Sequence, residues 1–185
     1  LLMEKLFVTG NSFLDQKKYQ TKFIAVRYGN VLGSSGSVLP KFIKQIKNNE
    51  KITITDPEMT RFSLTMDEAL DFILNATYIG KGSEVFIPKL KAYSISGLKE
   101  SLFQLFGDSG SKIISLRPGE KMHETLLNHD EIRYAWELDE TYILFNSSKK
   151  ESEIKKSYPG IKKIKMSNSY TSNSVNELTA IELKK

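Results

Sequence analysis

Cysteine is absent from this chain of 185 residues. Its absence excludes disulfide bonds, thiolate nucleophiles and zinc–thiolate centres together. Histidine is scarce as well, with only His123 and His129. Both stand in polar segments that we expect at the surface, so no nucleophilic triad can be built around them. His123 beside Glu124 could form half of a metal site, but no further carboxylate pattern accompanies it, and we expect no metal centre.

Long apolar runs and a secretory signal are also missing from the sequence. No stretch is long enough to cross a bilayer, which predicts a soluble protein without a membrane span. The lack of cysteine is consistent with a reducing compartment, and we expect the protein in the cytoplasm. The Gly-x-Gly-x-x-Gly pattern that follows the first strand of a dinucleotide-binding fold does not occur anywhere in the chain.

Positive charge is in modest excess, with 27 basic against 22 acidic residues and a net charge of +5. Many of the lysines recur in short runs, namely Lys41, Lys44 and Lys47 and then Lys162, Lys163 and Lys165. Such runs form either a polyanion-binding surface or the solvated face of a helix. No helix-turn-helix, zinc-finger or RNA-binding aromatic signature accompanies them, so we expect no nucleic-acid partner.

The most informative stretch is a strand pattern at residues 22–28 that runs into a loop of small residues. The strand is dense in β-branched and aromatic side chains without polar alternation, which predicts a parallel strand covered on both faces. The loop offers positive φ angles, close approach of the backbone to a ligand, and hydroxyl donors, through Gly29, Gly33, Gly36, Ser34, Ser35 and Ser37. Ligands of open α/β sheets bind at this carboxyl end of the strands. The alternative is an ordinary Gly/Ser turn.

The rest of the chain alternates between strand and helix patterns, which predicts an α/β fold. We expect strands at residues 52–55, 61–64, 84–87, 112–116 and 141–145, and helices at residues 1–8, 40–48, 66–79, 98–106, 131–138 and from 179. Thr65 and Glu68 form a capping box, so the acidic residues there mark a helix start and not an acid/base pair. Residues 147–157 are rich in Ser, Lys and Glu, which predicts a mobile linker.

Two arginines, Arg61 and Arg117, each stand where an apolar run meets a polar loop. This arrangement is typical of guanidinium groups that grip a diphosphate. The alternative for each is an ordinary surface ion pair.

Three motifs resemble the carboxyl-terminal half of extended short-chain dehydrogenase/reductase enzymes that act on nucleotide sugars: Arg27-Tyr28-Gly29-Asn30-Val31, Met59-Thr60-Arg61-Phe62 and Arg117-Pro118-Gly119-Glu120-Lys121. Residues 132–137, 158–161 and 170–173 resemble the short carboxyl-terminal extension of the CapD-like members. The resemblance implies the carboxyl-terminal part of an NAD(P)-binding Rossmann-like fold with its substrate-binding subdomain. It places the core at residues 1–146 and the CapD-like extension at residues 147–185.

The resemblance also implies that the chain is a fragment. In the resembling enzymes the catalytic Tyr-x-x-x-Lys pair, or its methionine-containing variant, directly precedes the helix that begins here at Leu1, and the glycine-rich fingerprint lies far upstream. We therefore expect no catalytic residue within these 185 residues, and neither turnover nor tight NAD(P) binding by the chain alone.

Six residues match binding positions of the family. The backbone of Tyr28 would border the nicotinamide, although plain core packing explains a tyrosine there equally well. Asn30 would face the nucleotide sugar, with turn capping as its alternative. Lys41 would lie near the uridine, or else be a solvent-exposed lysine.

The other three matches concern the nucleotide. Arg61 and Arg117 would clamp the diphosphate, and Glu120 would accept hydrogen bonds from the ribose hydroxyls.

For the full-length parent, the resemblance implies a UDP-N-acetylglucosamine 4,6-dehydratase, in some members also a 5-epimerase, in surface or capsular polysaccharide biosynthesis. A UDP-glucose 4-epimerase is the alternative, and a non-catalytic nucleotide-sugar binding or assembly module is an alternative of another class. The parent would use NAD or NADP, held mainly by the amino-terminal half, and would assemble as a homo-oligomer. Trp136, Tyr158 and Tyr170 would be aromatic anchors that pack on the nucleotide-sugar domain or on a neighbouring subunit.

Overall fold

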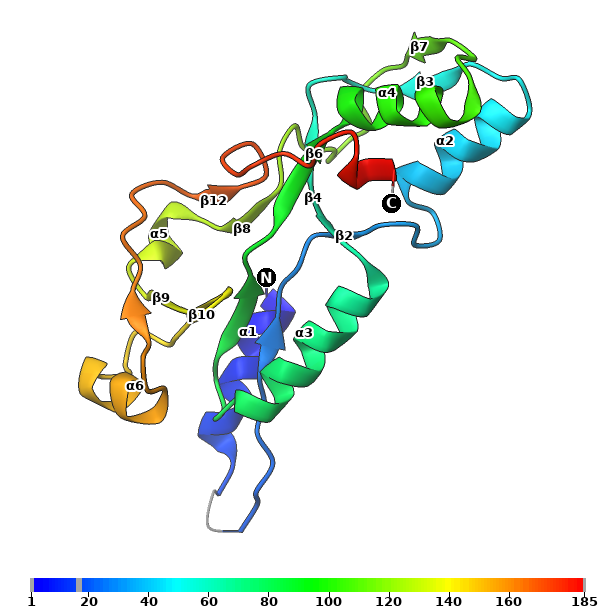
Figure 1. Cartoon of the computed structure of the whole chain (residues 1–185). Helices are drawn as coiled ribbons and strands as arrows, with labels where there is room; N and C mark the ends of the chain where they lie inside the picture. The colour runs from blue at the N-terminus through cyan, green and yellow to red at the C-terminus, as the bar shows by residue number, and fades with distance from the viewer. Residues whose placement is uncertain (1, 16–17, 185) are drawn as a thin grey trace. The chain divides into compact units, whose positions relative to one another are not determined.

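A computed structural model describes residues 2–15 and 18–184 (Figure 1). Leu1, where the predicted helical pattern begins, lies outside the described residues. The chain forms two compact units, and each unit is assembled from three separate segments. Unit 1 combines the segment that ends at Tyr28 with Leu70–Lys89 and Leu126–Ser169; unit 2 combines Gly29–Ala69, Leu90–Thr125 and the segment that starts at Tyr170. The predicted division after residue 146 stays a prediction.

Unit 1 is built on a five-stranded mixed sheet with the order β1-β5-β10-β9-β11. Its first pair is parallel, and the other three pairs are antiparallel. The strands are β1 (Ala25–Val26), β5 (Val85–Pro88), β9 (Ala135–Leu138), β10 (Thr141–Leu144) and β11 (Lys162–Lys163). The helices are α1 (Leu2–Thr9), the 3₁₀ turn η1 (Gly10–Phe13), α5 (His129–Ile132) and α6 (Glu151–Ser157). The 14-residue helix α3 (Met66–Ile79) begins in unit 2 and continues in unit 1.

The strand predicted at residues 22–28 is parallel to its neighbour, as expected, but it is much shorter than the pattern suggested. Only Ala25 and Val26 form β1, and both are half-buried. The reason is the place of β1 in the described sheet, where it lies at an edge and pairs with β5 alone. A strand with a neighbour on one side only is not covered as a central strand is.

The helix predicted at residues 131–138 is wrong in its second half. A capping box between Asn128 and Glu131 starts a single turn, α5, which ends at Ile132. Ala135–Leu138 is strand β9, which forms a two-residue hairpin with β10 through Asp139 in the left-handed region (φ 49°). Trp136 decides the outcome, because pairing with β10 buries its large side chain in the core of unit 1.

The linker predicted at residues 147–157 is also wrong, because Glu151–Ser157 forms α6. One apolar residue is enough to fix the helix: Ile154 is buried in the unit 1 core with Tyr158 and Ile161. The Tyr158 ring packs edge-on to Phe145 at 5.6 Å. A polar composition therefore did not prevent this segment from docking.

Unit 2 combines a three-stranded sheet of order β2-β4-β6 with a parallel pair, β3 and β7. The β2–β4 pair is parallel and the β4–β6 pair is antiparallel. The strands are β2 (Asn30–Val31), β3 (Ile52–Ile54), β4 (Thr60–Leu64), β6 (Lys91–Ser94), β7 (Ser111–Ile113) and β12 (Tyr170–Thr171). The helices are α2 (Val38–Lys47), α4 (Ile95–Phe106) and the terminal 3₁₀ turn η2 (Glu182–Lys184). β12 lies beside β8 (Thr125–Leu127), which begins in unit 2.

The two longer helices of this unit, α2 and α4, pack against each other next to β3 and β7 (Figure 1). Phe42 and Ile46 of α2 are buried against Ile52, Tyr93 and Leu98, which confirms the predicted apolar stripe. β7 is shorter than the predicted strand at residues 112–116, because it pairs only with β3 and its three residues are exposed.

Several local signals are confirmed by their hydrogen bonds. In the capping box before α3, the Thr65 amide donates to Glu68 Oε2 (2.6 Å) and the Glu68 amide donates to Thr65 Oγ1 (3.2 Å). α4 ends at Gly107, whose φ is 92°. None of the described helices combines the length and the apolar composition that crossing a bilayer requires.

Candidate functional site

An open, polar cavity of about 410 Å³ lies in unit 2, between the ends of β2, β3 and β4 and the first turns of α2. Five of the six residues predicted from the sequence line it: Asn30, Lys41, Arg61, Arg117 and Glu120. They come from four separate stretches of the chain, which the fold brings together. Their individual roles stay predictions.

The Gly/Ser loop forms one wall of this cavity through Ser34–Ser37. Gly33 (φ 74°) and Gly36 (φ 80°) have positive φ angles, which the loop pattern predicted. Ser37 precedes α2, and its hydroxyl oxygen is buried without a hydrogen-bond partner in the described part of the chain. The loop therefore presents a hydroxyl that a bound molecule can satisfy.

Gly29 has a structural purpose besides the one predicted. A Cβ at this position would lie 2.3 Å from the Cβ of Phe62, so the missing side chain lets the backbone pack against β4. Gly29 is not among the described glycines with a positive φ angle, and its approach to a ligand stays a prediction. The sequence pattern could not distinguish the two, because both need the same small residue.

The guanidinium of Arg61 is partly immobilised by the protein. Nη1 donates to the carbonyl oxygens of Thr60 (2.8 Å) and Met122 (3.0 Å), and Nη2 contacts Met59 Sδ at 3.4 Å. Its side chain is 13% exposed and stands 4.0 Å from Glu120 Oε1. Nε has no partner among the described residues, so Arg61 still offers a donor and a positive charge to a ligand.

Arg117 is the opposite case, because its exposed side chain makes no hydrogen bond or ion pair within the described residues. Its backbone is fixed by a turn in which the Glu120 amide donates to the Arg117 carbonyl (3.0 Å), and the Arg117 amide donates to Glu120 Oε2 (3.3 Å). Lys41 of α2 is also exposed and has no hydrogen-bond or ion-pair partner among the described residues. Two unpaired cations thus face the cavity beside the partly held Arg61.

Glu120 connects the walls of the cavity. Oε1 accepts a hydrogen bond from the Thr55 hydroxyl (3.3 Å) and lies near Arg61, and Oε2 accepts from the Arg117 amide. An ionised carboxylate offers about four acceptor positions, so capacity remains for a hydroxyl of a ligand.

Two further residues interact with the predicted ones: Tyr93, which no sequence pattern singled out, and Glu124, which the sequence suggested only as half of a metal site with His123. Tyr93 is 2% exposed and its hydroxyl is hydrogen-bonded with Asn30. Burial and the nearby charge of Glu124 raise the pKa of Tyr93 to about 12. Burial also raises the pKa of Glu124, against the opposing effects of the hydrogen bond from the Phe62 amide and the charges of Arg61 and Lys121.

Tyr28 does not line this cavity, since it belongs to unit 1, where its side chain is 38% exposed. The histidines also differ from each other. His129 is exposed, as predicted, whereas His123 is half-buried with Nδ1 2.8 Å from the Thr60 hydroxyl. No cluster of three or more metal-ligating groups occurs among the residues that the structure describes.

Unit 1 contains a second arginine-lined cavity of about 450 Å³, in which Arg27 is fully engaged by the protein. Its five N–H donors bind both oxygens of Glu4 (2.5 and 2.6 Å), both oxygens of Glu131 (2.9 and 2.7 Å) and the Leu126 carbonyl (2.9 Å). Burial would lower the pKa of Arg27, but these carboxylates raise it. No donor of Arg27 remains for a ligand.

Known proteins resemble this chain over most of its length. A sequence model of the family described as polysaccharide biosynthesis proteins matches residues 1–146. The UDP-N-acetylglucosamine 4,6-dehydratase (inverting) of Campylobacter jejuni is 38% identical over 150 residues, which cover 80% of this chain and 43% of the relative. The UDP-glucose 4-epimerase of Rickettsia akari is 34% identical over 185 residues, which cover 100% of this chain and 54% of the relative. The chain spans about half the length of the curated relatives it matches.

Solved structures show the same likeness. Pen from Bacillus thuringiensis has a TM-score of 0.82 at 35% identity and covers 98% of this chain, which covers 52% of Pen. The UDP-glucuronic acid 4-epimerase of Bacillus cereus, solved in complex with UDP-glucuronic acid and NAD, has a TM-score of 0.50 at 23% identity, covering 58% of this chain and 37% of that enzyme. This second likeness shows the fold alone. Together with the mixed sheets, these matches confirm the predicted α/β fold of extended short-chain dehydrogenase/reductase enzymes that act on nucleotide sugars.

Proposed function

The chain belongs to the family of polysaccharide biosynthesis proteins, and from this premise we propose that it is part of an enzyme that modifies UDP-sugars. The unit 2 cavity binds the nucleotide portion of that substrate. The reaction of the parent is 4,6-dehydration of UDP-N-acetylglucosamine, as in the Campylobacter relative. Epimerisation at C4 is the second candidate, because the Rickettsia relatives are UDP-glucose 4-epimerases.

One observation carries this proposal: three cationic side chains, with the two carboxylates of Asp56 and Glu120, line a single polar cavity. A diphosphate has the charge and the oxygen acceptors to satisfy Arg61 and Arg117, and guanidinium groups bind it with paired hydrogen bonds. Ribose hydroxyls suit the free acceptor capacity of Glu120. Lys41 supplies further charge toward the uridine, and Asn30 meets the sugar.

The described residues do not themselves provide a dinucleotide site. No Gly-x-Gly-x-x-Gly pattern is present in the sequence, and Tyr28 alone matches a position beside the nicotinamide. We propose that NAD or NADP is held mainly by other parts of the parent protein. The contribution of this chain is to bind the substrate and to orient its sugar.

We also propose that the parent works in the cytoplasm and assembles as a homo-oligomer. Trp136, Tyr158 and Tyr170 were expected to pack either on the nucleotide-sugar domain or on a neighbouring subunit, and their burial supports packing within the chain. Trp136, Tyr158 and Tyr170 are each 3% exposed within their own units, so they are not available to a second copy. Other residues must form the contact.

The test is UDP binding measured by isothermal titration calorimetry on the chain and on its variants. Each arginine contributes charge-assisted hydrogen bonds worth about 1.5–3 kcal/mol. Arg117→Ala and Arg61→Ala are therefore each expected to raise the Kd for UDP roughly ten- to a hundredfold. Arg→Lys variants recover part of the loss, because one ammonium does not reproduce the planar fork.

Two controls decide whether a higher Kd for UDP reflects lost contacts to its phosphates. Uridine lacks phosphates, so its binding is expected to be insensitive to either arginine substitution. Arg133→Ala removes an exposed arginine of unit 1 that does not line the cavity, and it is expected to leave the Kd for UDP unchanged. Failure of the native chain to bind UDP, or an equal loss for uridine and UDP, refutes the proposed site.

A further inference from the structure

A buried serine from the carboxyl-terminal segment, Ser172, is inserted behind the start of β4. It is 0% exposed. Its hydroxyl oxygen lies 2.7 Å from Thr60 Oγ1 and 3.1 Å from the Thr60 carbonyl oxygen, and it accepts a hydrogen bond from the Glu124 amide (2.9 Å). The Ser172 amide in turn donates to the Glu124 carbonyl (2.9 Å). Nothing in the binding site described above uses this side chain.

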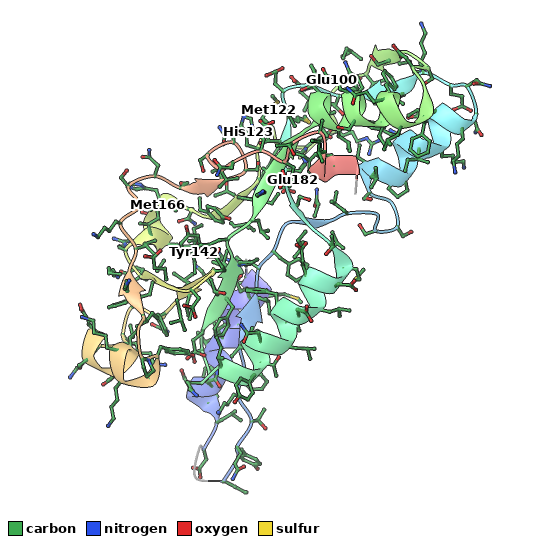
Figure 2. The ribbon with its side chains drawn as sticks, viewed as in Figure 1. Glu100, Met122, His123, Tyr142, Met166 and Glu182 are labelled. Carbon is green, nitrogen blue, oxygen red and sulfur yellow. The ribbon has the colours of Figure 1, made fainter. Side chains whose placement is uncertain are left out.

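The Thr60 carbonyl connects Ser172 to the cavity. This oxygen accepts one hydrogen bond from Ser172 Oγ and another from Nη1 of Arg61 (2.8 Å). A carbonyl oxygen has two lone pairs, so both donors can be satisfied at once. The second acceptor of Arg61, the carbonyl of Met122, is fixed in the same way, because it also accepts from the Thr60 amide (3.0 Å). Met122 and His123 are labelled in Figure 2.

The segment that carries Ser172 is docked firmly within unit 2. The Tyr170 ring packs on Phe62 at 4.9 Å, and its hydroxyl accepts from the Leu90 amide (2.6 Å). Further along, the Ala92 amide donates to the Asn176 carbonyl (3.1 Å), and the Leu178 amide donates to the Ala92 carbonyl (2.7 Å). These bonds cover the open edge of β6, so the position of Ser172 is set by contacts on both sides of it.

We propose that Ser172 is a positioning residue for Arg61, so that the carboxyl-terminal segment determines how tightly the site holds a diphosphate. This inference rests on the proposed function for the identity of the ligand. Ser172 does not line the cavity; it fixes the carbonyl on which the Arg61 guanidinium is anchored. Without it, Arg61 keeps its charge but loses a fixed direction, and an arginine that must be ordered on binding binds more weakly.

The experiment is a double-mutant cycle on UDP affinity with Ser172→Ala and Arg61→Ala. Ser172→Ala removes neutral hydrogen bonds, and we expect the Kd for UDP to rise about two- to tenfold while the Kd for uridine stays unchanged. In the Arg61→Ala background, Ser172→Ala is expected to have no further effect on the Kd for UDP, because Ser172 acts on the ligand only through Arg61. An unchanged Kd in Ser172→Ala, or an equal loss in both backgrounds, overturns the proposal.

Ser174→Ala is the matched control. Ser174 is an exposed serine of the same segment whose hydroxyl bonds only to the backbone of Thr171. It is expected to leave the binding of UDP and uridine unchanged. Circular dichroism on each variant verifies that it is folded, and Ser172→Cys, of similar size with a weak donor, replaces Ser172→Ala if the latter unfolds.

A second measurement tests the link without any ligand. In ¹⁵N spectra of the arginine side chains, with the Arg61 signal assigned by Arg61→Lys, we expect the guanidinium of Arg61 to rotate faster in Ser172→Ala than in the native chain. Unchanged rotation refutes the positioning role. If the native chain does not bind UDP, the proposed function fails, while this measurement still decides whether Ser172 orients Arg61.

Discussion

Arg27 in unit 1 and Arg117 in unit 2 belong to similar motifs, yet the protein treats them in opposite ways. All five donors of Arg27 are bound by Glu4, Glu131 and a backbone carbonyl. The Arg117 side chain is exposed and has no partner within the described residues. Arg61 is intermediate, because its Nη1 is bound by two backbone carbonyls and its Nε has no partner within the described residues. An arginine in a family motif is therefore a candidate for ligand binding only if some of its N–H donors have no partner within the protein.

Arg27→Ala tests the structural role of Arg27 and has the largest expected effect. We expect this change to lower the free energy of unfolding by about 3–5 kcal/mol, because it leaves two largely buried carboxylates without their partner. The side chains of Glu4 and Glu131 are only 17% and 16% exposed. Urea unfolding followed by circular dichroism measures the change. A loss below about 1 kcal/mol, the level of a surface ion pair, would show that Arg27 is not the structural member of the comparison.

The same network predicts a dependence on pH. Burial would raise the pKa of Glu131, but the hydrogen bonds from Arg27 and the Asn128 amide, with the charge of Arg27, lower it below the ordinary value of 4.5. Ionised Glu131 therefore stabilises the folded state above about pH 4.5, and this contribution is lost as the pH falls through the folded-state pKa.

Glu131→Gln removes that contribution, by roughly 1–3 kcal/mol for a charged hydrogen bond. We expect the difference in unfolding free energy between native and variant chains to be full at pH 7 and to shrink progressively below pH 4.5. Urea titrations at several pH values measure it. A difference that stays constant down to pH 3 would contradict the assignment of a lowered pKa to Glu131.

The smallest expected effect is that of a substitution at Tyr93 in unit 2. Tyr93→Phe removes the hydrogen bond with Asn30, and we expect a loss of about 0.5–1.5 kcal/mol in unfolding free energy. Because the pKa of Tyr93 is raised to about 12, the absorbance difference between native and variant chains should show little phenolate from Tyr93 at pH 10 and only about a tenth at pH 11. Ionisation near pH 10 would mean that Tyr93 is not buried against Glu124.

Local sequence signals predicted those parts of the fold whose causes are local. The capping box at Thr65, the apolar stripe of α2 and the stop at Gly107 each depend on residues within one or two turns. Three of the errors, at residues 22–28, 131–138 and 147–157, have distant causes. An edge position shortened the first element, hairpin pairing of Trp136 changed the second, and burial of Ile154 folded the third.

The residues of the candidate site also form two groups, those that local sequence signals predicted and those that depend on distant contacts. Five predicted residues meet in one cavity, and each stands in or beside a family motif or a polar loop that the sequence pattern reveals. Tyr93 and Ser172 left no such signal. Their partners are Asn30 and Thr60, and Thr60 is 112 residues away from Ser172 in the sequence. A hydrogen bond across that separation has no characteristic spacing for a sequence pattern to detect.

The interleaving of the two units has a consequence for how the protein is made. Each unit combines three segments that are separated in the sequence, so no single cut separates the units, and unit 2 cannot finish folding before the segment that starts at Tyr170 has been synthesised. Contacts between distant segments also slow folding, because a long loop must close before they form. The carbonyl of Thr60 can receive its second donor only after residue 172 has left the ribosome. The hydrogen bonds that anchor Arg61 are therefore complete only after the segment that carries Ser172 has been synthesised.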